Sequence, residues 1–334
     1  MAKKILNDHF DAVDEMLDGI LKAHPTHLRS VGSSGRALVR AGAPVAGKVG
    51  IVTGGGAGHL PLFLGYVGEG LADGAAVGNV FASPGPAPMY DCIKAVDTGQ
   101  GVVQIFGNYQ GDTMNFAAAA EMARVDGIRV VASIGNDDVA SAPNDRAAER
   151  RGVAGLFFAL KLAGAKASEG ASLQEVKSTA DGVIANTRTM GVALSPCTVP
   201  AAGRPTFEIG EDEMEIGMGI HGEPGVLRTR MRSADEIAET LLKGIQEDLP
   251  LSQGDEVSVL VNGLGATPPT ELYVVFRRVY DLLRAQGIRI HKSYVGEYAT
   301  SLEMAGCSVS VLRLTPEYRR LIEAPMHSPF LLHK

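Results

Sequence analysis

The sequence predicts an α/β protein of two domains, with mostly parallel strands in its sheets and helices packed on either side. Three observations lead to this prediction. Short apolar runs alternate with longer segments whose apolar residues recur at helical spacing, as in proteins with parallel sheets. Several of these runs end in segments rich in glycine, which occurs 41 times in the chain. The length of 334 residues fits two domains of ordinary size.

The elements of the first half alternate regularly. The first helix is indicated by Val13, Leu17 and Ile20 at helical spacing, and His24 before Pro25 ends it. In chain order we expect a helix at 11–24, strands at 48–53 and 75–81, a helix at 88–97, a strand at 101–106, a helix at 117–126 and a strand at 128–133. Two further helices are expected at 145–163 and 173–190.

A domain boundary is expected where prolines gather, at Pro196, Pro200 and Pro205. The predicted domains are therefore 1–192 and 193–334. After the boundary, the acidic segment 208–215 is expected to be solvated rather than to hold a metal. A helix at 235–247 begins with Ser233 as a possible cap. The remaining expected elements are a strand at 256–261, a helix at 270–286 and strands at 288–293 and 309–313.

Composition narrows the class of protein. The net charge of −7 and the absence of any Lys/Arg-rich block argue against nucleic acid or an anionic membrane as a partner. No apolar run approaches the ~18 residues of a membrane span, and the N-terminus lacks a signal-peptide pattern. A cytoplasmic protein is therefore expected. The three cysteines have no metal-type spacing, which fits reduced thiols in a reducing compartment.

A glycine-rich segment directly follows the expected strand at 48–53. It runs from Gly54 to Gly58 and closes with His59. Such a turn can present backbone N–H groups to a polar or anionic ligand. It lacks the G-x-G-x-x-G spacing of dinucleotide sites, and no Gly-Lys-Ser/Thr follows, so neither a Rossmann nor a Walker-type site is expected.

Three polar residues follow three of the expected strands. They are His59, Ser83 and Asp112. Because ligands of parallel sheets bind beyond the carboxyl ends of the strands, these residues can share one rim of the sheet. The sequence therefore predicts a single site there.

A second candidate group is His221, which stands in the segment Gly-Ile-His-Gly-Glu-Pro-Gly at 219–225. Small neighbours leave its imidazole uncovered, so it can act as a base, a metal ligand or a nucleophile. The alternative is an exposed histidine in an ordinary turn. The tripeptide His-Gly-Glu is similar to the H-x-E of zinc deaminases, but the Cys-x-x-Cys that those enzymes require is absent.

Many segments, in the same order, resemble the dihydroxyacetone kinase K-subunit family nearly end to end. They include 43–49, 54–61, 81–84, 108–116, 151–154, 197–203, 214–225, 262–268 and 301–306. The resemblance implies two α/β domains, each with a mixed, mostly parallel sheet flanked by helices.

The resemblance also implies roles for single residues. His221 matches the histidine that bonds covalently to a ketone as a hemiaminal. His59 and Asp112 match the acid/base and hydroxyl-orienting residues. Substrate-binding positions are expected at Gly55, Gly56, Ser83 and Gly107, and no metal ligand is expected.

The expected reaction is phosphorylation of dihydroxyacetone or a similar short-chain ketose. The sequence contains no nucleotide loop and no closely spaced aspartates for Mg²⁺. The resemblance therefore implies a partner L subunit in trans that carries ATP, or ADP rephosphorylated by a phosphotransferase-system phosphocarrier, with Mg²⁺. It also implies a homodimer.

Two departures from the family pattern concern the substrate. Members specific for dihydroxyacetone commonly have Glu where Leu60 stands and Lys where Gly107 stands. We therefore hypothesise a larger ketose, such as erythrulose or a branched tetrulose; the alternative is loop variation without a change of substrate. A further alternative function is a non-catalytic ketose sensor that uses the same pocket.

Overall fold

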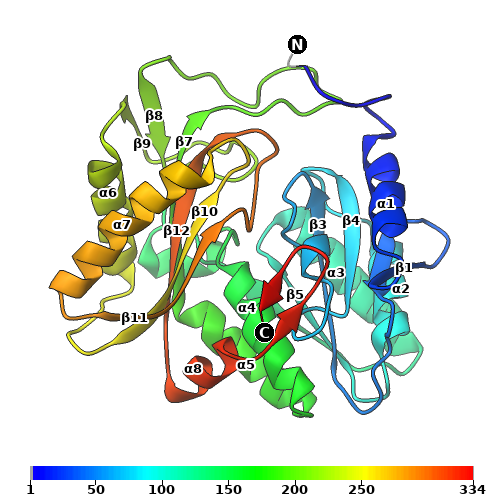
Figure 1. Cartoon of the computed structure of the whole chain (residues 1–334). Helices are drawn as coiled ribbons and strands as arrows, with labels where there is room; N and C mark the ends of the chain where they lie inside the picture. The colour runs from blue at the N-terminus through cyan, green and yellow to red at the C-terminus, as the bar shows by residue number, and fades with distance from the viewer. Residues whose placement is uncertain (1–2, 334) are drawn as a thin grey trace. The chain divides into compact units, whose positions relative to one another are not determined.

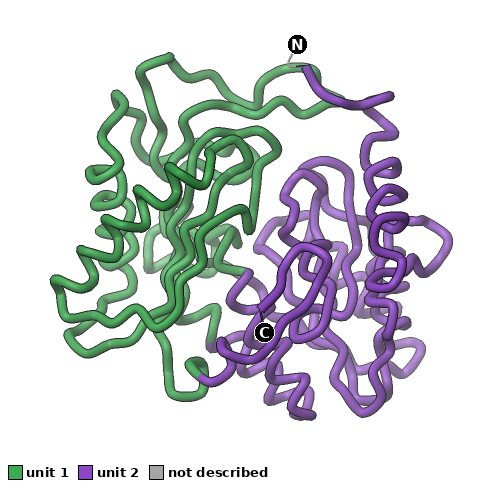
Figure 2. Tube along the Cα trace, in the orientation of Figure 1, with its two compact units in different colours: residues 1–2, 136–156, 183–319 green, residues 3–135, 157–182, 320–334 purple. Residues whose placement is uncertain are grey.

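The computed structural model describes residues 3–333, which form two compact units (Figure 2). Unit 1 comprises residues 136–156 and 183–319, and unit 2 comprises 3–135, 157–182 and 320–333. The units are thus interleaved along the chain, whereas the sequence predicts consecutive domains 1–192 and 193–334. The predicted boundary between residues 192 and 193 falls inside β7 (Thr187–Ser195), a strand of the unit 1 sheet, and the prolines follow directly after this strand.

The sheet of unit 2 contains the parallel strands that the sequence predicts. Its strands in spatial order are β1 (Leu28–Val31), β2 (Ala37–Arg40), β4 (Gly74–Val80), β3 (Gly50–Ala57), β5 (Val102–Gly107) and β6 (Val130–Gly135). Strands β4, β3, β5 and β6 pair in parallel, and β1 and β2 complete the sheet antiparallel. The carboxyl ends of the parallel strands therefore lie at one edge.

Helices pack on both faces of this sheet (Figure 1). On one face, α2 (Pro86–Val96) and α3 (Gln110–Val125) bury Met89 and Phe116 in a cluster with Val39. On the other, α1 (Ala12–Ala23) buries Leu17 in a cluster with Leu38. Leu38 and Val39 are neighbours on β2, and successive strand residues point to opposite faces.

The remaining elements of unit 2 lie later in the chain. They are most of α4 (Leu156–Ser168) and α5 (Leu173–Ala185), the end of α8 (Pro316–Ile322), and the hairpin of β13 (Met326–His327) and β14 (Leu332–His333). A 3₁₀ helix at Leu64–Tyr66 precedes β4. Helix α4 is almost entirely buried, which its run of Leu, Phe and Ala makes possible.

The sheet of unit 1 is mixed, but most of its strand pairs are antiparallel. Its order is β11 (Arg289–Gly296), β10 (Glu256–Gly263), β12 (Ala305–Arg313), β7, β8 (Glu213–Ile216) and β9 (Leu227–Arg230). Strands β10 and β11 pair in parallel through the crossover helix α7 (Pro269–Ala285), and the other neighbours pair antiparallel. The mixed α/β class is confirmed, but this sheet is not mostly parallel, because its other neighbouring strands are not joined by helical crossovers.

One face of this sheet is covered by α6 (Ala234–Asp248) and α7, which lie side by side (Figure 1). Leu241 and Val279 belong to the same buried cluster as Val259 and Val309 of the sheet. Helix α6 begins with a capping box, in which Ser233 and Glu236 bond reciprocally to each other's backbone. The prediction of Ser233 as a cap is confirmed. A short 3₁₀ helix at Asn144–Glu149 completes the unit.

Several predicted boundaries are wrong, each for a local reason. Residues 54–57 belong to β3 rather than to a turn, because glycines there allow close approach of neighbouring groups. Helix α3 begins at Gln110, not near residue 117. The helix predicted at 145–163 is interrupted over residues 150–155, between a 3₁₀ helix and α4. The helix predicted to reach Met190 ends at Ala185, where β-branched residues favour β7.

Candidate functional site

His221 lies in the loop of a β-hairpin in unit 1. Strands β8 and β9 pair antiparallel from Glu213 to Arg230, and residues 217–226 connect them. The connection is closed by the Val226 amide, which donates to the carbonyl of Ile216 at 2.8 Å. Gly222 has φ of +85°, a conformation that only glycine adopts without strain. The glycines of the motif therefore fix the loop that carries the imidazole.

A carboxylate holds the ring of His221. Nδ1 of His221 lies 2.9 Å from Oε1 of Glu223, and the His221 backbone N–H donates to Oε2 at 2.9 Å. A carboxylate can only accept, so Nδ1 carries the ring proton in this bond. In a neutral imidazole, Nε2 then carries the lone pair. The side chain is 23% exposed, so it is accessible to a small molecule while its orientation is fixed.

Arg151 lies on the other side of Glu223. Its Nη1 is 3.7 Å from Glu223 Oε2, its Nη2 donates to the Gly217 carbonyl at 3.3 Å, and Asp138 accepts from its Nε at 2.9 Å. Burial alone would raise the pKa of Glu223, but the hydrogen bond from His221 and the charges of His221 and Arg151 outweigh it and lower that pKa to about 2. Glu223 is therefore a carboxylate at any physiological pH.

Gly219 leaves room for this arrangement. A Cβ at Gly219 would lie 2.1 Å from Oε2 of Glu223 and 2.3 Å from Nη1 of Arg151. The hydroxyl of Ser301 also donates to the carbonyl of Ile220 at 2.5 Å and holds the loop from a distant part of the chain. The loop is thus held by side chains that its own seven-residue motif does not contain.

The candidate residues of unit 2 lie together at the carboxyl edge of its sheet. His59 follows β3 and is 1% exposed, and its ring stacks on Phe81, which follows β4, with ring centroids 4.9 Å apart. A Cβ at Gly56 would lie 2.7 Å from the amide nitrogen of Ala82, so glycine is required where β3 meets this loop. A Cβ at Gly55 would overlap the ring of Phe63.

Ser83 and Asp112 belong to the same edge. A Cβ at Gly111 would lie 3.1 Å from Cβ of Ser83, and the side chain of Asn115 donates to the carbonyl of Pro84 at 2.8 Å. Asp112 is 7% exposed and lies in the first turn of α3, where the helix dipole favours a negative charge. Gly107 is the buried last residue of β5.

The structure therefore brings Gly55, Gly56, His59, Ser83, Gly107 and Asp112 to one edge of the unit 2 sheet, as the strand order predicts. His221 belongs to unit 1. Sequence reasoning assigned no role to Glu223, Arg151 or Asp138. A carboxylate two positions after a histidine is a usable local signal for Glu223. No local signal links Arg151 to a loop about 70 residues later in the chain.

Other features of the described chain bear on the class of site. Within residues 3–333, no group of three or more His, Cys, Asp or Glu side chains is placed to hold a metal ion. No helix in the same range is both long enough and apolar enough to cross a membrane. In the segment 208–215, Glu215 is buried and pairs with Arg228 at 2.7 Å, so its carboxylate has a structural partner.

The chain is thus an α/β protein with two features of a candidate site. In unit 1, a carboxylate holds a histidine in a hairpin loop, and in unit 2, polar residues lie at the carboxyl ends of parallel strands. The model of the Dak1 domain matches residues 18–330, and the chain belongs to this family. The resemblance stated from the sequence is confirmed.

Three known proteins illustrate the relationship. The chain is 44% identical over 328 residues to the dihydroxyacetone-binding subunit DhaK of PTS-dependent dihydroxyacetone kinase 2 of Listeria innocua, with 98% of each chain covered. It is 44% identical to the D-erythrulose kinase of Mycolicibacterium smegmatis, covering 98% of this chain but 56% of that enzyme. The solved structure of the dihydroxyacetone kinase operon co-activator Dha-DhaQ superposes with a TM-score of 0.86 at 31% identity, covering 93% of this chain and 96% of that one.

Proposed function

We propose that this chain is the ketose-binding subunit of a dihydroxyacetone kinase-like enzyme and binds a short-chain ketose as a hemiaminal on His221. The observation that carries the proposal is the 2.9 Å contact between Nδ1 of His221 and Glu223, which directs the lone pair of a neutral imidazole to Nε2. The name of the Listeria innocua relative, a dihydroxyacetone-binding subunit, supports the substrate class.

The addition balances without a co-reactant. Nε2 forms a bond to the carbonyl carbon while the C=O π bond breaks and its electrons move to oxygen. The oxygen takes up one proton from solvent, and the imidazolium releases its Nδ1 proton to solvent, while Glu223 remains ionised and stabilises the transient positive charge of the ring. The product is a neutral hemiaminal. Bonding in this way orients a small substrate that offers few groups for recognition.

The residues at the edge of the unit 2 sheet receive the remaining roles by family resemblance. His59 acts as the acid or base for the carbonyl oxygen, and Asp112 accepts the proton of the terminal hydroxyl as it attacks phosphorus. Gly55, Gly56, Ser83 and Gly107 contribute to substrate binding. The position of Asp112 in the first turn of α3 supports an ionised carboxylate, which this role requires.

The phosphoryl group comes from a partner in this proposal. An L-type subunit supplies ATP, or ADP that a phosphotransferase-system phosphocarrier rephosphorylates, together with Mg²⁺. The D-erythrulose kinase relative supports a separate phosphoryl-donating part, because the match covers 56% of that enzyme and the rest of it has no counterpart in this chain. The name of the Listeria innocua relative includes dependence on the phosphotransferase system. A cytoplasmic homodimer is part of the same proposal.

The size of the ketose is a finer part of the proposal. Gly107 stands where a lysine is common in dihydroxyacetone-specific members, and its lack of a side chain supports a four-carbon ketose such as erythrulose. The 44% identity to a D-erythrulose kinase equals the identity to the dihydroxyacetone-binding subunit of Listeria innocua, so identity favours neither ketose. Leu60 has a structural explanation, because its side chain packs against the buried cluster beneath α1. The substrate argument therefore depends on Gly107.

Intact-protein mass spectrometry after incubation with dihydroxyacetone or erythrulose and rapid desalting tests the proposal. We expect a mass increase of one ketose that is absent from His221→Ala and retained in a control, His9→Ala, which alters an exposed histidine. Retention of the adduct in His221→Ala, or its absence with both ketoses in the wild type, would contradict the proposal. A larger fraction of adduct with dihydroxyacetone than with erythrulose at equal concentration would contradict the four-carbon preference.

A ketose sensor is the second candidate function. The observation that favours it is the similarity to the operon co-activator Dha-DhaQ over 93% of this chain. A sensor needs the adduct but no phosphoryl transfer. Turnover with a purified L subunit and its phosphoryl donor would support the kinase subunit, whereas adduct formation without turnover for every L subunit tested would support the sensor.

A further inference from the structure

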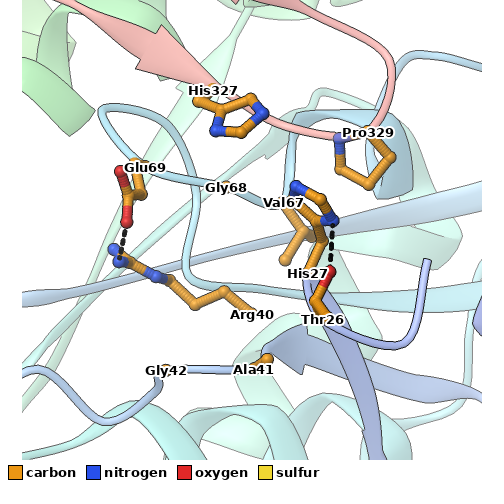
Figure 3. Close-up of a pocket in the computed structure, with 10 residues that line it drawn as sticks. All are labelled: Thr26, His27, Arg40, Ala41, Gly42, Val67, Gly68, Glu69, His327 and Pro329. Atoms are coloured by element: carbon orange, nitrogen blue, oxygen red, sulfur yellow. Dashed lines mark hydrogen bonds and ion pairs between the residues drawn. The ribbon is translucent and has the colours of Figure 1, made fainter.

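Unit 2 contains a polar cavity that is lined by none of its candidate site residues His59, Ser83 and Asp112 (Figure 3). Its volume is about 430 Å³, within the ordinary range for small-molecule sites. The cavity is lined by segments that precede β4 and follow β2, so it lies beside the amino ends of the parallel strands. Strand β4 separates it from the loop of Ser83 by seven residues, or roughly 20 Å of extended chain.

Backbone hydrogen bonds join the segments that form the wall. Glu69 and His327 exchange two such bonds, at 2.8 and 2.9 Å, and the Ala41 amide donates to the carbonyl of His27 at 2.7 Å. A Cβ at Gly68 would lie 2.1 Å from the carbonyl oxygen of His327, so glycine is required for this approach. The cavity is therefore formed in advance of any ligand.

Three nitrogen-bearing side chains line the same space. The rings of His27 and His327 lie edge to face with centroids 5.0 Å apart, and Arg40 lines the same cavity with its guanidinium directed toward Glu69 (Figure 3). The hydroxyl of Thr26 lies 3.2 Å from Nδ1 of His27. When this hydroxyl donates, the ring proton is on Nε2, and His27 can donate a hydrogen bond in either protonation state.

The positive charges of Arg40 and Lys48 are balanced only when the exposed carboxylate of Glu69 is counted together with the buried carboxylate of Asp73. Asp73, whose side chain is 4% exposed, pairs with Lys48 at 2.5 Å and with Arg40 at 3.4 Å, so one buried carboxylate faces two cations. The second partner of Arg40 is Glu69, at 3.4 Å, and the Glu69 side chain is 72% exposed. An ion pair with one exposed partner at this distance contributes little stability, so the carboxylate of Glu69 can be displaced from Arg40 at low cost.

We propose that this cavity binds the phosphate group of a small phosphate monoester or inorganic phosphate. Arg40 supplies a planar fork that matches phosphate oxygens, and His27 and His327 supply ring N–H donors. In the structure as described, the carboxylate of Glu69 occupies the anion's place beside Arg40. A bound phosphate replaces that carboxylate and balances the buried positive charge. This site does not depend on the ketose chemistry proposed for His221.

Isothermal titration calorimetry with inorganic phosphate, dihydroxyacetone phosphate and uncharged dihydroxyacetone, at constant ionic strength, tests the proposal. All proteins carry His221→Ala, so that binding at the hairpin is removed. Arg40→Gln should weaken phosphate binding about tenfold or more, because it removes a charge-assisted contact. Glu69→Gln should tighten binding several-fold, because it removes the competing carboxylate. Glu211→Gln, an exposed control, should have no effect.

The variants separate the possible outcomes. Equal affinities for the two phosphates would identify inorganic phosphate as the sufficient ligand, and tighter binding of the ester would identify a phosphate monoester. If Arg40→Gln does not fold, as judged by circular dichroism, the other two variants test the proposal. Glu69→Gln should bind phosphate more tightly than the wild type, and His327→Gln should bind it more weakly. Absence of phosphate binding up to about 10 mM, or affinities unchanged in Glu69→Gln and His327→Gln, would overturn the proposal.

Discussion

Glu223 lies two residues after His221 and contacts it twice, through the ring nitrogen Nδ1 and through the backbone N–H, each at 2.9 Å. One carboxylate therefore fixes both the conformation of the loop and the position of the ring proton. The low pKa of Glu223 follows from the same contacts. The first three predictions below depend on this pair.

Glu223→Gln should slow formation of the ketose adduct by about a hundredfold or more, a typical effect of losing a positioned acid or base. The amide can donate to Nδ1, which moves the ring proton to Nε2 and removes the nucleophilic lone pair. The rate is measured by stopping the reaction at intervals and recording intact mass. Glu211→Gln, an exposed acidic residue before the same hairpin, should react at the wild-type rate. An unchanged rate in Glu223→Gln would show that the carboxylate does not position the ring.

The stability of the protein should depend on Glu223 in a defined pH range. Its pKa in the fold is about 2, below the ordinary value of 4.5, so the folded state holds the ionised form more strongly than the unfolded chain does. The resulting stabilisation is fully present above the ordinary pKa and is lost as the pH falls from about 4.5 toward 2. Urea unfolding of wild type and Glu223→Gln should show a constant difference from about pH 7 to 5 and a shrinking difference below it. A difference that stays constant to the lowest pH would contradict the assignment.

Gly219→Ala should disturb the contact between His221 and Glu223. The new Cβ would overlap both Glu223 and Arg151, so one of them must move. We expect a loss of about 1–3 kcal/mol in the free energy of unfolding and a fall in the adduct rate. Gly85→Ala is the matched control, because a Cβ there has no neighbouring atom within 4 Å. Equal effects of the two substitutions would contradict the geometry of the hairpin loop.

The three cysteines should be unreactive in the folded protein. Cys92, Cys197 and Cys307 are buried, and burial raises the pKa of each thiol, to about 12 for Cys307. The thiolate is the reactive form, so 5,5′-dithiobis(2-nitrobenzoic acid) at neutral pH should label none of them rapidly. After unfolding in guanidinium chloride, all three should react. Rapid labelling of one thiol in the native protein would show that its position is accessible.

The sequence predicts the local elements better than the way they are assembled. The alternation of strands and helices before residue 135 correctly predicts parallel pairing of β3, β4, β5 and β6, and with it a shared edge for His59, Ser83 and Asp112, but not the order of these strands. In unit 1, β12 lies between β10 and β7, and the register that places Val309 opposite Met190 is decided by burial of both faces. No local pattern specifies such pairing.

The candidate site shows the same division. His221 is recognisable as a candidate because its small neighbours leave the imidazole uncovered, and family resemblance supplies a role. The side chains that hold it, Glu223, Arg151 and Ser301, are ordinary residues in their own segments. Glu223 is close enough in sequence to be found locally, but Arg151 and Ser301 reach the loop only when distant segments fold together, and sequence spacing does not indicate these contacts.

The strand order of the unit 1 sheet has a consequence for the order in which the protein can assemble during synthesis. Strand β7 leaves the ribosome more than one hundred residues before β12, its partner along one edge. Until β12 is made, β7 can pair only with β8, which begins the hairpin of His221. The nascent chain therefore carries an exposed strand edge during this interval, which is the kind of surface that chaperones protect. The hairpin gains its fixed support only after residues 305–313 have been made and close the sheet.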